Sequence, residues 1–345
     1  MIPASPPGSS MARESADWLQ RSGLGALRLA GRNLLPIVQG GMGIGISGNR
    51  LAGSVAALGG VGTLSSVDLR RHHPDLMEQT RDLAPGEAAK AGINAANLVA
   101  IDREIHAARE RTGGRGLLAI NVMRAVSEYA ANVTRALEAG IDAVVVGAGL
   151  PLDLPDLAKD HPKAALIPIL SDARGVQLLV KKWERKKRLP DAVVIEHPRL
   201  AGGHLGAARI GDLGDTRFDF ENVLPAVRQF FKDAGYEQHI PLIAAGGISS
   251  CEDIARLQAL GADAVQLGTA FAVTEESDAH AEFKRVLAQA RPEDMVEFTS
   301  VAGLPARAVG TPWLRAYLKI EPKLQAVAQV LSLIHISEPT RLGMI

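Results

Sequence analysis

Short apolar, β-branched runs alternate along the chain with longer segments in which apolar residues recur at helical spacing. The runs predict eight strands: Leu34–Gln39, Val61–Ser65, Leu117–Met123, Ala143–Val146, Leu166–Leu170, Ala192–Ile195, Pro241–Ala245 and Ala264–Leu267. The helical spacing predicts helices over Asn49–Leu58, Asn94–Arg111, Ser127–Ala139, Asp153–Lys159, Val176–Lys187, Phe220–Ala234 and Cys251–Leu260. Strands that are apolar on both faces and joined by helices indicate a parallel sheet buried on both sides.

A parallel sheet of this kind is either an open, doubly wound sheet or a closed barrel. Eight units within about 240 residues favour the α/β class in its (β/α)8 TIM barrel form, with a small additional helical segment. We expect the barrel and its inserted helical region within residues 31–330, after a partly disordered N-terminal lead-in, residues 1–30. Two long loops, Pro198–Arg217 and Glu297–Trp313, are expected at the functional end of the barrel.

The two ends of the chain carry little fold information. The first ten residues are rich in Pro and Ser and lack the apolar core of a signal peptide. Leu331–Arg341 reads LSLIHISEPTR, which resembles the translation of a common sequencing-library adapter. We therefore expect residues 331–345 to be non-native.

Charge and composition exclude several classes of function. Lys+Arg and Asp+Glu both number 38, and aromatic residues make up only 4%, so neither a basic surface nor a stacking platform for nucleic acid is expected. Cys251 is the only cysteine, which excludes an internal disulfide, and no metal-binding constellation is visible. No apolar run approaches the length of a membrane span. We expect a cytoplasmic monomer or homodimer that acts on a small molecule.

A glycine-rich loop, Gly40–Gly48, follows the first strand. Gly43, Gly45 and Gly48 match the G-x-G-x-x-G fingerprint of dinucleotide-binding folds, and Asp68 follows 20 residues later. Three interpretations are open: an NAD site on an open Rossmann sheet, a simple tight turn, or a loop that passes close over a flavin ring. We prefer the third because of the loops described next.

Two further glycine loops end the seventh and eighth strands, in the sequences AAGGI and QLGTA. A phosphate commonly binds between these two loops in barrels. Gly246, Gly247 and Gly268 would let backbone N–H groups approach phosphate oxygens, and Thr269 could add a hydroxyl donor. Ordinary strand-end turns are the alternative.

Polar residues near other strand ends are candidates for catalysis. His204, framed by glycines in AGGHLG, could transfer a proton near neutral pH, unless it is an ordinary surface histidine. His197, at the tip of the sixth strand, is a weaker candidate. Asn121 could bind the edge of a heterocycle, or it could be a satisfied polar residue of the core. The same holds for the pair that ends the fifth strand, Ser171 and Asp172. The fourth strand ends in Gly147 and Gly149, which could admit a ring or form a turn.

Taken in order, these motifs resemble the nitronate monooxygenase family, formerly called 2-nitropropane dioxygenases. The similarity covers about Leu34 to Leu314 and rests on PIVQGGMG, AGGHLG, IAAGGI, ADAVQLGTAF and FAVTEESDAHAEFK. One departure is Leu200, which stands before AGGH where many members carry an acidic residue.

The resemblance implies a noncovalent FMN at the C-terminal end of the barrel and oxidation of alkyl nitronates, such as propionate 3-nitronate, by O2 to a carbonyl compound and nitrite. It implies His204 as the catalytic base or as the residue that orients an anionic substrate. It also implies these cofactor-binding residues: Gly41, Met42, Asn121, Gly203, Gly246, Gly247, Gly268 and Thr269. Two other functions stay open on the same barrel: an FMN-dependent NAD(P)H reductase of quinones or enoyl-acyl-carrier-protein, and a non-catalytic binding protein for a phosphorylated ligand.

Overall fold

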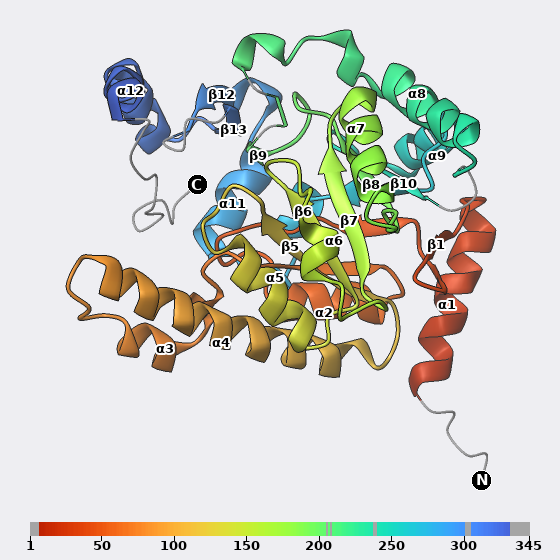
Figure 1. Cartoon of the computed structure of the whole chain (residues 1–345), viewed down its shortest axis with the longest axis horizontal. Helices are drawn as coiled ribbons and strands as arrows, with labels where there is room; N and C mark the ends of the chain where they lie inside the picture. The colour runs from red at the N-terminus through yellow and green to blue at the C-terminus, as the bar shows by residue number, and fades with distance from the viewer. Residues whose placement is uncertain (1–6, 205, 208, 237–239, 301–304, 332–345) are drawn as a thin grey trace.

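The fold is taken from a computed structural model, which describes residues 7–204, 206–207, 209–236, 240–300 and 305–331 (Figure 1). Residues 332–345, which make up most of the tail that we expected to be non-native, lie outside the described residues. None of the helices in the described part of the chain combines the length and the apolar character needed to cross a membrane.

Eight parallel strands close into a barrel. In chain order they are β3 (Ile37–Gln39), β4 (Val61–Ser65), β5 (Leu117–Met123), β6 (Ala143–Gly147), β7 (Ala165–Leu170), β8 (Val193–Glu196), β10 (Leu242–Ala245) and β11 (Ala264–Leu267). Closure is made by β11 and β3, where Gln266 is in register with Val38. This arrangement confirms the predicted (β/α)8 barrel and excludes the open Rossmann sheet, because an open sheet keeps two unpaired edges.

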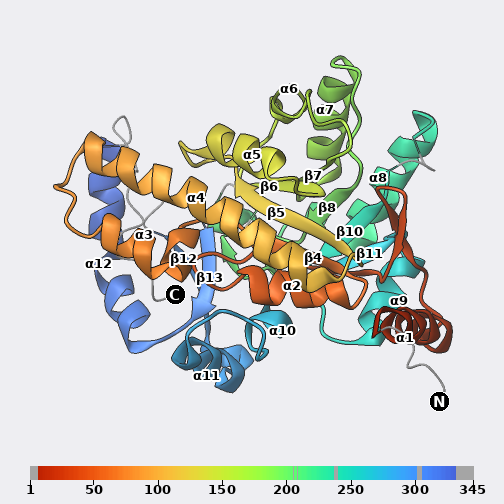
Figure 2. The same cartoon turned by 90° about the horizontal axis from the view of Figure 1, so that it is seen from below.

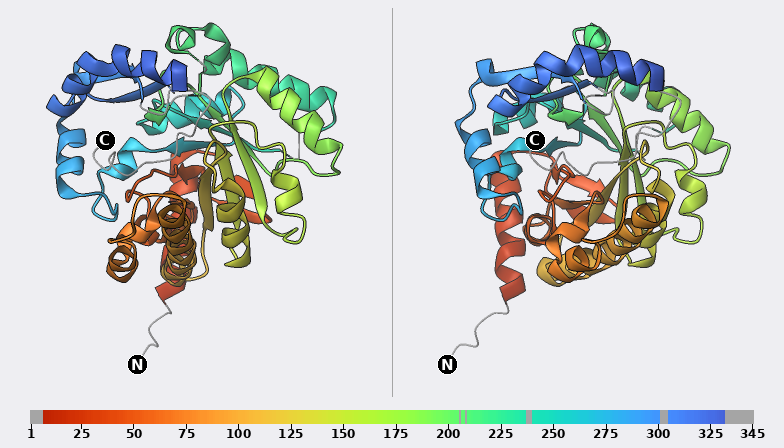
Figure 3. Two further views of the ribbon diagram at one scale, coloured as in Figure 1. Left: turned by 60° about the vertical axis from the view of Figure 1, so that its left-hand side comes forward. Right: turned by 90° about the vertical axis from the view of Figure 1, so that its left-hand side faces the viewer.

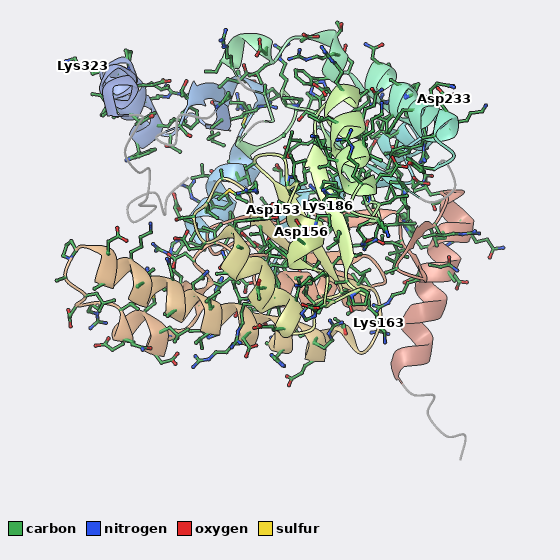
Figure 4. The ribbon with its side chains drawn as sticks, in the orientation of Figure 1. Asp153, Asp156, Lys163, Lys186, Asp233 and Lys323 are labelled. Atoms are coloured by element: carbon green, nitrogen blue, oxygen red, sulfur yellow. The ribbon has the colours of Figure 1, made fainter. Side chains whose placement is uncertain are left out.

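Helices surround the barrel. They are α2 (Asn49–Ala57), α4 (Glu87–Thr112), α5 (Tyr129–Glu138), α6 (Leu154–Leu157), α7 (Ala173–Glu184), α8 (Phe220–Asp233), α9 (Cys251–Ala259) and α10 (Thr269–Ala272). Ion pairs join neighbouring segments of this outer layer. Lys186 Nζ, just after α7, lies 2.5 Å from Asp156 Oδ2 on α6, and both side chains are labelled in Figure 4. The additional helical segment comprises the 3-10 turn η1 (Leu69–His72) and α3 (Pro74–Gln79), which lies along α4 (Figure 2) and is joined to it by the Asp75–Arg103 ion pair.

The alternation of side chains along each strand divides the core into two shells. On β8, Val193 and Ile195 join the outer cluster beneath the helices, whereas Ala192, just before the strand, and Val194 join the inner cluster that fills the barrel. The inner cluster contains residues of all eight strands: Val38, Val61, Leu117, Ala119, Ala143, Val145, Ala165, Ile167, Val194, Ile243, Ala245 and Ala264.

A hairpin closes the N-terminal end of the barrel, which corrects the predicted start of the first strand. Its strands are β1 (Leu27–Leu29) and β2 (Arg32–Leu34), and its leucines join the inner cluster. Leu34 therefore does not begin the first barrel strand; Pro36, which has no N–H to donate, separates the hairpin from β3. Residues 1–30 are not only a lead-in, since they also include the helix α1 (Pro7–Ser22) and this apolar floor.

The two long loops pair with each other at the opposite end. Strands β12 (Met295–Thr299), β13 (Pro305–Val309) and β9 (Gly203–His204) form an antiparallel sheet, in which His204 is in register with Ala306. The chain continues through α12 (Pro312–Leu331), which lies with this sheet at one side of the molecule, far from α1 (Figures 1 and 3). The remaining elements are the 3-10 turns η2 (Ile210–Asp212), η3 (Thr216–Phe218) and η4 (Pro292–Asp294), and the helix α11 (Ala281–Gln289).

Candidate active site

The inner face of the barrel changes from apolar to polar at the C-terminal ends of its strands. Side chains two residues apart on a strand point to the same face. Asn121, Glu196 and Gln266 each stand two residues after a member of the inner cluster: Ala119, Val194 and Ala264, respectively. They therefore point to the inside of the barrel. Ser171 follows Ile169, which packs against the same cluster, in the same way. The interior of the barrel is therefore filled by apolar side chains, and its C-terminal end is lined by two amides, a carboxyl group and a hydroxyl group.

The predicted flavin-facing residues Gly41 and Asn121 are in direct contact. Asn121 Nδ2 donates a hydrogen bond to the Gly41 carbonyl at 3.2 Å, while Asn121 Oδ1 is buried and has no partner in the described part of the chain. A Cβ atom on Gly41 would overlap the Cβ of Asn121. A buried amide oxygen without a donor is an acceptor left for a ligand, such as the N–H of a heterocycle.

The glycine loop after β3 is held in place by buried side chains. Ser47 Oγ accepts hydrogen bonds from Met42 N and from Gln39 Nε2, both at 2.9 Å. Gln39 Oε1 in turn accepts from Thr63 N at 2.8 Å, which ties the loop to β4. Met42 Sδ lies 3.7 Å from the position that a Cβ atom would take on Gly268, so the loops after β3 and β11 are neighbours.

The dinucleotide interpretation of this loop is wrong. Two carboxylates already occupy the N-terminus of α2, where a pyrophosphate would bind: Gly48 N donates to Asp278 Oδ2 at 3.1 Å and Asn49 N donates to Glu104 Oε2 at 2.7 Å. Burial, with a contribution from Glu104, raises the pKa of Asp278. Asp68, the expected ribose ligand, instead pairs with Arg70 and Arg71.

The two loops expected to bind phosphate lie side by side. Their strands pair through Ala245 and Gln266, and Gly246 and Gly247 have φ angles of +112° and +69°, a region that favours glycine. Among the described residues, the backbone N–H groups of Gly246, Gly247 and Gly268 donate to no protein acceptor. Thr269 is exposed at the start of α10. The loops therefore present several free donors, as an anion-binding site requires.

The histidine loop returns to the same end of the barrel. The backbone of Gly203 and His204 forms β9, in register with Arg307 and Ala306, whereas the His204 side chain lies outside the described part of the chain. Beyond them, Gly206 lies so close to Ser171 that a Cβ atom there would overlap Ser171 Oγ. The loop is thus anchored on both sides of His204.

Other candidate residues have structural surroundings. His197 faces outward from β8, is buried, and has Nε2 3.5 Å from Asp219 Oδ1 and its ring edge-on to Phe220. Asp172 accepts a hydrogen bond from Gly175 N at 2.6 Å and so caps α7. At the end of β6, Gly147 is buried against Ile169, and Gly149 has a φ of +127° beside Arg124.

Sequence analysis missed Glu196, the last residue of β8. Its side chain is half-buried on the inner side of the strand, and burial raises its pKa to about 7. The signal was available in the alternation of Ala192, Val194 and Glu196, which share one face of the strand. Among the described residues, no group of three or more His, Cys, Asp or Glu side chains could hold a metal ion.

Comparisons with known proteins identify the family of the chain. The family model for nitronate monooxygenase matches residues 32–336. A probable nitronate monooxygenase of Bacillus subtilis (strain 168) is 28% identical over 284 residues, which cover 81% of this chain and 77% of the relative.

Two solved structures are similar in fold. FabK from Thermotoga maritima has a TM-score of 0.62 at 24% identity, covering 86% of this chain and 77% of FabK. A nitroalkane oxidase from Streptomyces ansochromogenes has a TM-score of 0.62 at 23% identity, covering 90% of this chain and 85% of the oxidase. Because the family model spans the barrel, the hairpin strand before it and the strands that hold the histidine loop, the chain belongs to the nitronate monooxygenase family of flavin-dependent oxidoreductases.

Proposed function

We propose that this protein binds FMN at the C-terminal end of its barrel and uses O2 to oxidise alkyl nitronates to carbonyl compounds and nitrite. The observation that carries the proposal is the convergence of three things at one end of the barrel: free backbone donors, an unpartnered amide oxygen and the histidine loop. Family membership supports the flavin and the class of reaction.

The residues present fit FMN. Gly246, Gly247, Gly268 and Thr269 would hold the phosphate through backbone N–H groups and a hydroxyl. Gly41 and Met42 would lie against the ring system. Asn121 Oδ1 would accept a hydrogen bond from the edge of the ring, and Gly203 would let the histidine loop approach the cofactor.

When bound, FMN would accept electrons from the nitronate and pass them to O2. The protein's own residues would bind, orient and handle protons. His204 would orient the nitronate anion, or take the proton from the carbon of a neutral nitroalkane, from a backbone position fixed by β13. The apolar packing of the barrel below would exclude water from that side of the site.

The first experiment is an absorption spectrum of the purified protein, followed by separate anaerobic additions of propyl-2-nitronate and of NADH or NADPH. We expect a flavin spectrum that bleaches with the nitronate, consumption of O2 on aeration, and release of nitrite. A flavin that bleaches rapidly with NAD(P)H and ignores the nitronate would instead assign the protein as an FMN-dependent reductase. A protein that takes up no FMN when supplied in excess would contradict both functions.

A further inference from the structure

Glu196 has no assigned role in the site described above, although its side chain points to the inside of the barrel at the same C-terminal end. It continues the inward-facing series of Ala192 and Val194 and ends β8 between the ends of β7 and β10. The Oε2 atom lies 3.7 Å from the position that a Cβ atom would take on Gly206, two residues after His204. The carboxyl group therefore lies beneath the histidine loop, beside Ser171, whose hydroxyl donates to the Gly206 carbonyl at 3.3 Å.

In the described part of the chain, no cationic side chain pairs with this carboxyl group to balance a negative charge. Within the described part of the chain, Glu196 makes no hydrogen bond and no ion pair. Several titratable residues on adjoining elements are engaged with one another: Asp172 with Arg217, Arg217 with Asp215, His197 with Asp219, and Arg199 with Glu297. Arg174 on α7 and Arg209 beyond Gly206 are exposed, and neither forms an ion pair with Glu196. Arg307 donates to the Arg199 carbonyl. The His204 side chain lies outside the described part.

Burial without a cation favours the protonated form of a carboxyl group. Burial alone accounts for the rise in the pKa of Glu196 to about 7. Near neutral pH a large share of the molecules therefore carries a neutral carboxylic acid here, which is a hydrogen-bond donor, whereas an ionised carboxylate would repel an anion at the same place.

We propose that protonated Glu196 donates a hydrogen bond to the negatively charged oxygens of the substrate and so selects for an anion at the inner face of β8. The inference rests on the proposed function for the identity of that anion, the nitronate. No proton is transferred in this role; it stays on the carboxyl group. Glu196 is then a second contact of the substrate, beneath the histidine loop.

The test uses the FMN-loaded protein and sodium nitrite, an anion with two oxygens that resembles the nitronate head and is not oxidised in the assay. Binding is followed through the absorption spectrum of the flavin between pH 5.5 and 9. We expect the dissociation constant of the parent protein to rise about tenfold per pH unit above pH 7, because binding needs one proton on one group.

Three variants sharpen this test. Glu196→Gln keeps a donor that does not titrate, so nitrite binding should be retained and its dependence on pH above 7 should flatten. Glu196→Ala should bind nitrite weakly at every pH. Glu297→Gln is the matched control, an exposed glutamate of β12 at the same end of the molecule, and should keep the parent profile. Retained FMN and an unchanged circular dichroism spectrum establish folding of each variant.

Two results would overturn the inference. One is a Glu196→Gln profile that parallels the parent profile. The other is a Glu196→Ala variant whose nitrite dissociation constant equals that of the parent while the reduction potential of its flavin is shifted. That result would mean that the carboxyl group contacts the cofactor and not the substrate. The outcome is independent of turnover: a protein that binds nitrite through Glu196 and does not oxidise nitronates would contradict only the proposed function.

Discussion

Gly41 and Asn121 are in close contact at the C-terminal end of the barrel. The Gly41 carbonyl accepts a hydrogen bond from Asn121 Nδ2 at 3.2 Å, and there is no room for a side chain on the glycine. This contact fixes the orientation of the Asn121 amide and leaves Oδ1 free. Gly41 lies in the loop after the first barrel strand and Asn121 lies on the third strand, so their contact couples the glycine loop to the part of β5 that would face the flavin.

The Gly41→Ala variant should bind FMN more weakly, because the added methyl group must displace Asn121. We expect the dissociation constant for FMN, measured by quenching of flavin fluorescence, to rise by at least tenfold. Gly202→Ala is the control, since a Cβ atom on Gly202 would meet no atom of the described residues within 4 Å. Equal FMN affinities in the two variants would contradict the role of the contact.

Changing Gly247 to Val should reduce FMN retention through the backbone. Gly247 has a φ of +69°, which a β-branched residue adopts only with strain, and a Cβ atom would lie 3.0 Å from Leu200 Cδ1. We expect the variant to lose FMN during gel filtration while its far-UV circular dichroism is unchanged. Gly211→Ala, at a position with open space, should retain the cofactor; loss of FMN from both would point to general destabilisation.

Replacing His204 with Ala should lower kcat for a neutral nitroalkane by about 10²- to 10⁴-fold if the imidazole is a general base. The FMN content should remain that of the parent, because the phosphate loops come from other strands. His197→Gln provides the contrast: it should lower the melting temperature and spare kcat, since His197 packs between Asp219 and Phe220. Loss of kcat in His197→Gln alone would reverse the assignment of the two histidines.

The Glu104→Ala variant should destabilise the barrel by about 1–3 kcal/mol, the usual cost of leaving buried hydrogen-bonding groups unpaired. Glu104 is 1% exposed and accepts hydrogen bonds from the backbone and the side chain of Asn49. Urea unfolding measures the change, with Glu110→Ala on the exposed side of α4 as the control. If both variants unfold at the same urea concentration, the buried carboxylate does not anchor α2.

The stability of the protein should depend on pH through Glu196. Burial raises the folded-state pKa to about 7, above the ordinary value of 4.5, so the folded state holds the proton more tightly than the unfolded state. The contribution of this group to stability is complete below pH 4.5 and is lost as the pH rises through 7. Glutamine does not titrate, so the free energy of unfolding of Glu196→Gln minus that of the parent should rise between pH 4.5 and about pH 7 and be constant outside this range. Thermal melts of both proteins across pH 4–9 test this.

The barrel could be predicted from sequence because its strands are buried on both faces. Val61–Ser65, Leu117–Met123 and Ala264–Leu267 are short apolar runs with no more than two polar residues each, and their observed bounds match the predicted ones. The hairpin at residues 27–34 was missed because each strand has only three residues: Leu27–Leu29 alternates between apolar and polar, and Arg32–Leu34 does not alternate at all.

The site was only partly predictable because its parts are joined by contacts between residues far apart in the chain. The pairing of His204 with Ala306 spans about a hundred residues, and no local pattern signals it. The fingerprint at Gly43–Gly48 could not be interpreted without its surroundings, since Glu104 and Asp278 decide what the start of α2 can bind. The identities of Asn121 and Ser171 were visible, whereas their inward direction depended on the register of the strands.

The pairing of β9 with β13 has a consequence for biosynthesis. All eight barrel strands end by Leu267, whereas the strand that fixes the histidine loop begins only at Pro305, so the barrel strands leave the ribosome first. A nascent chain can thus complete the scaffold, with the N–H groups that would receive the phosphate, before His204 is immobilised. If the proposed function holds, flavin capture and catalytic competence would be separable stages, and a chain arrested between them would be yellow but inactive.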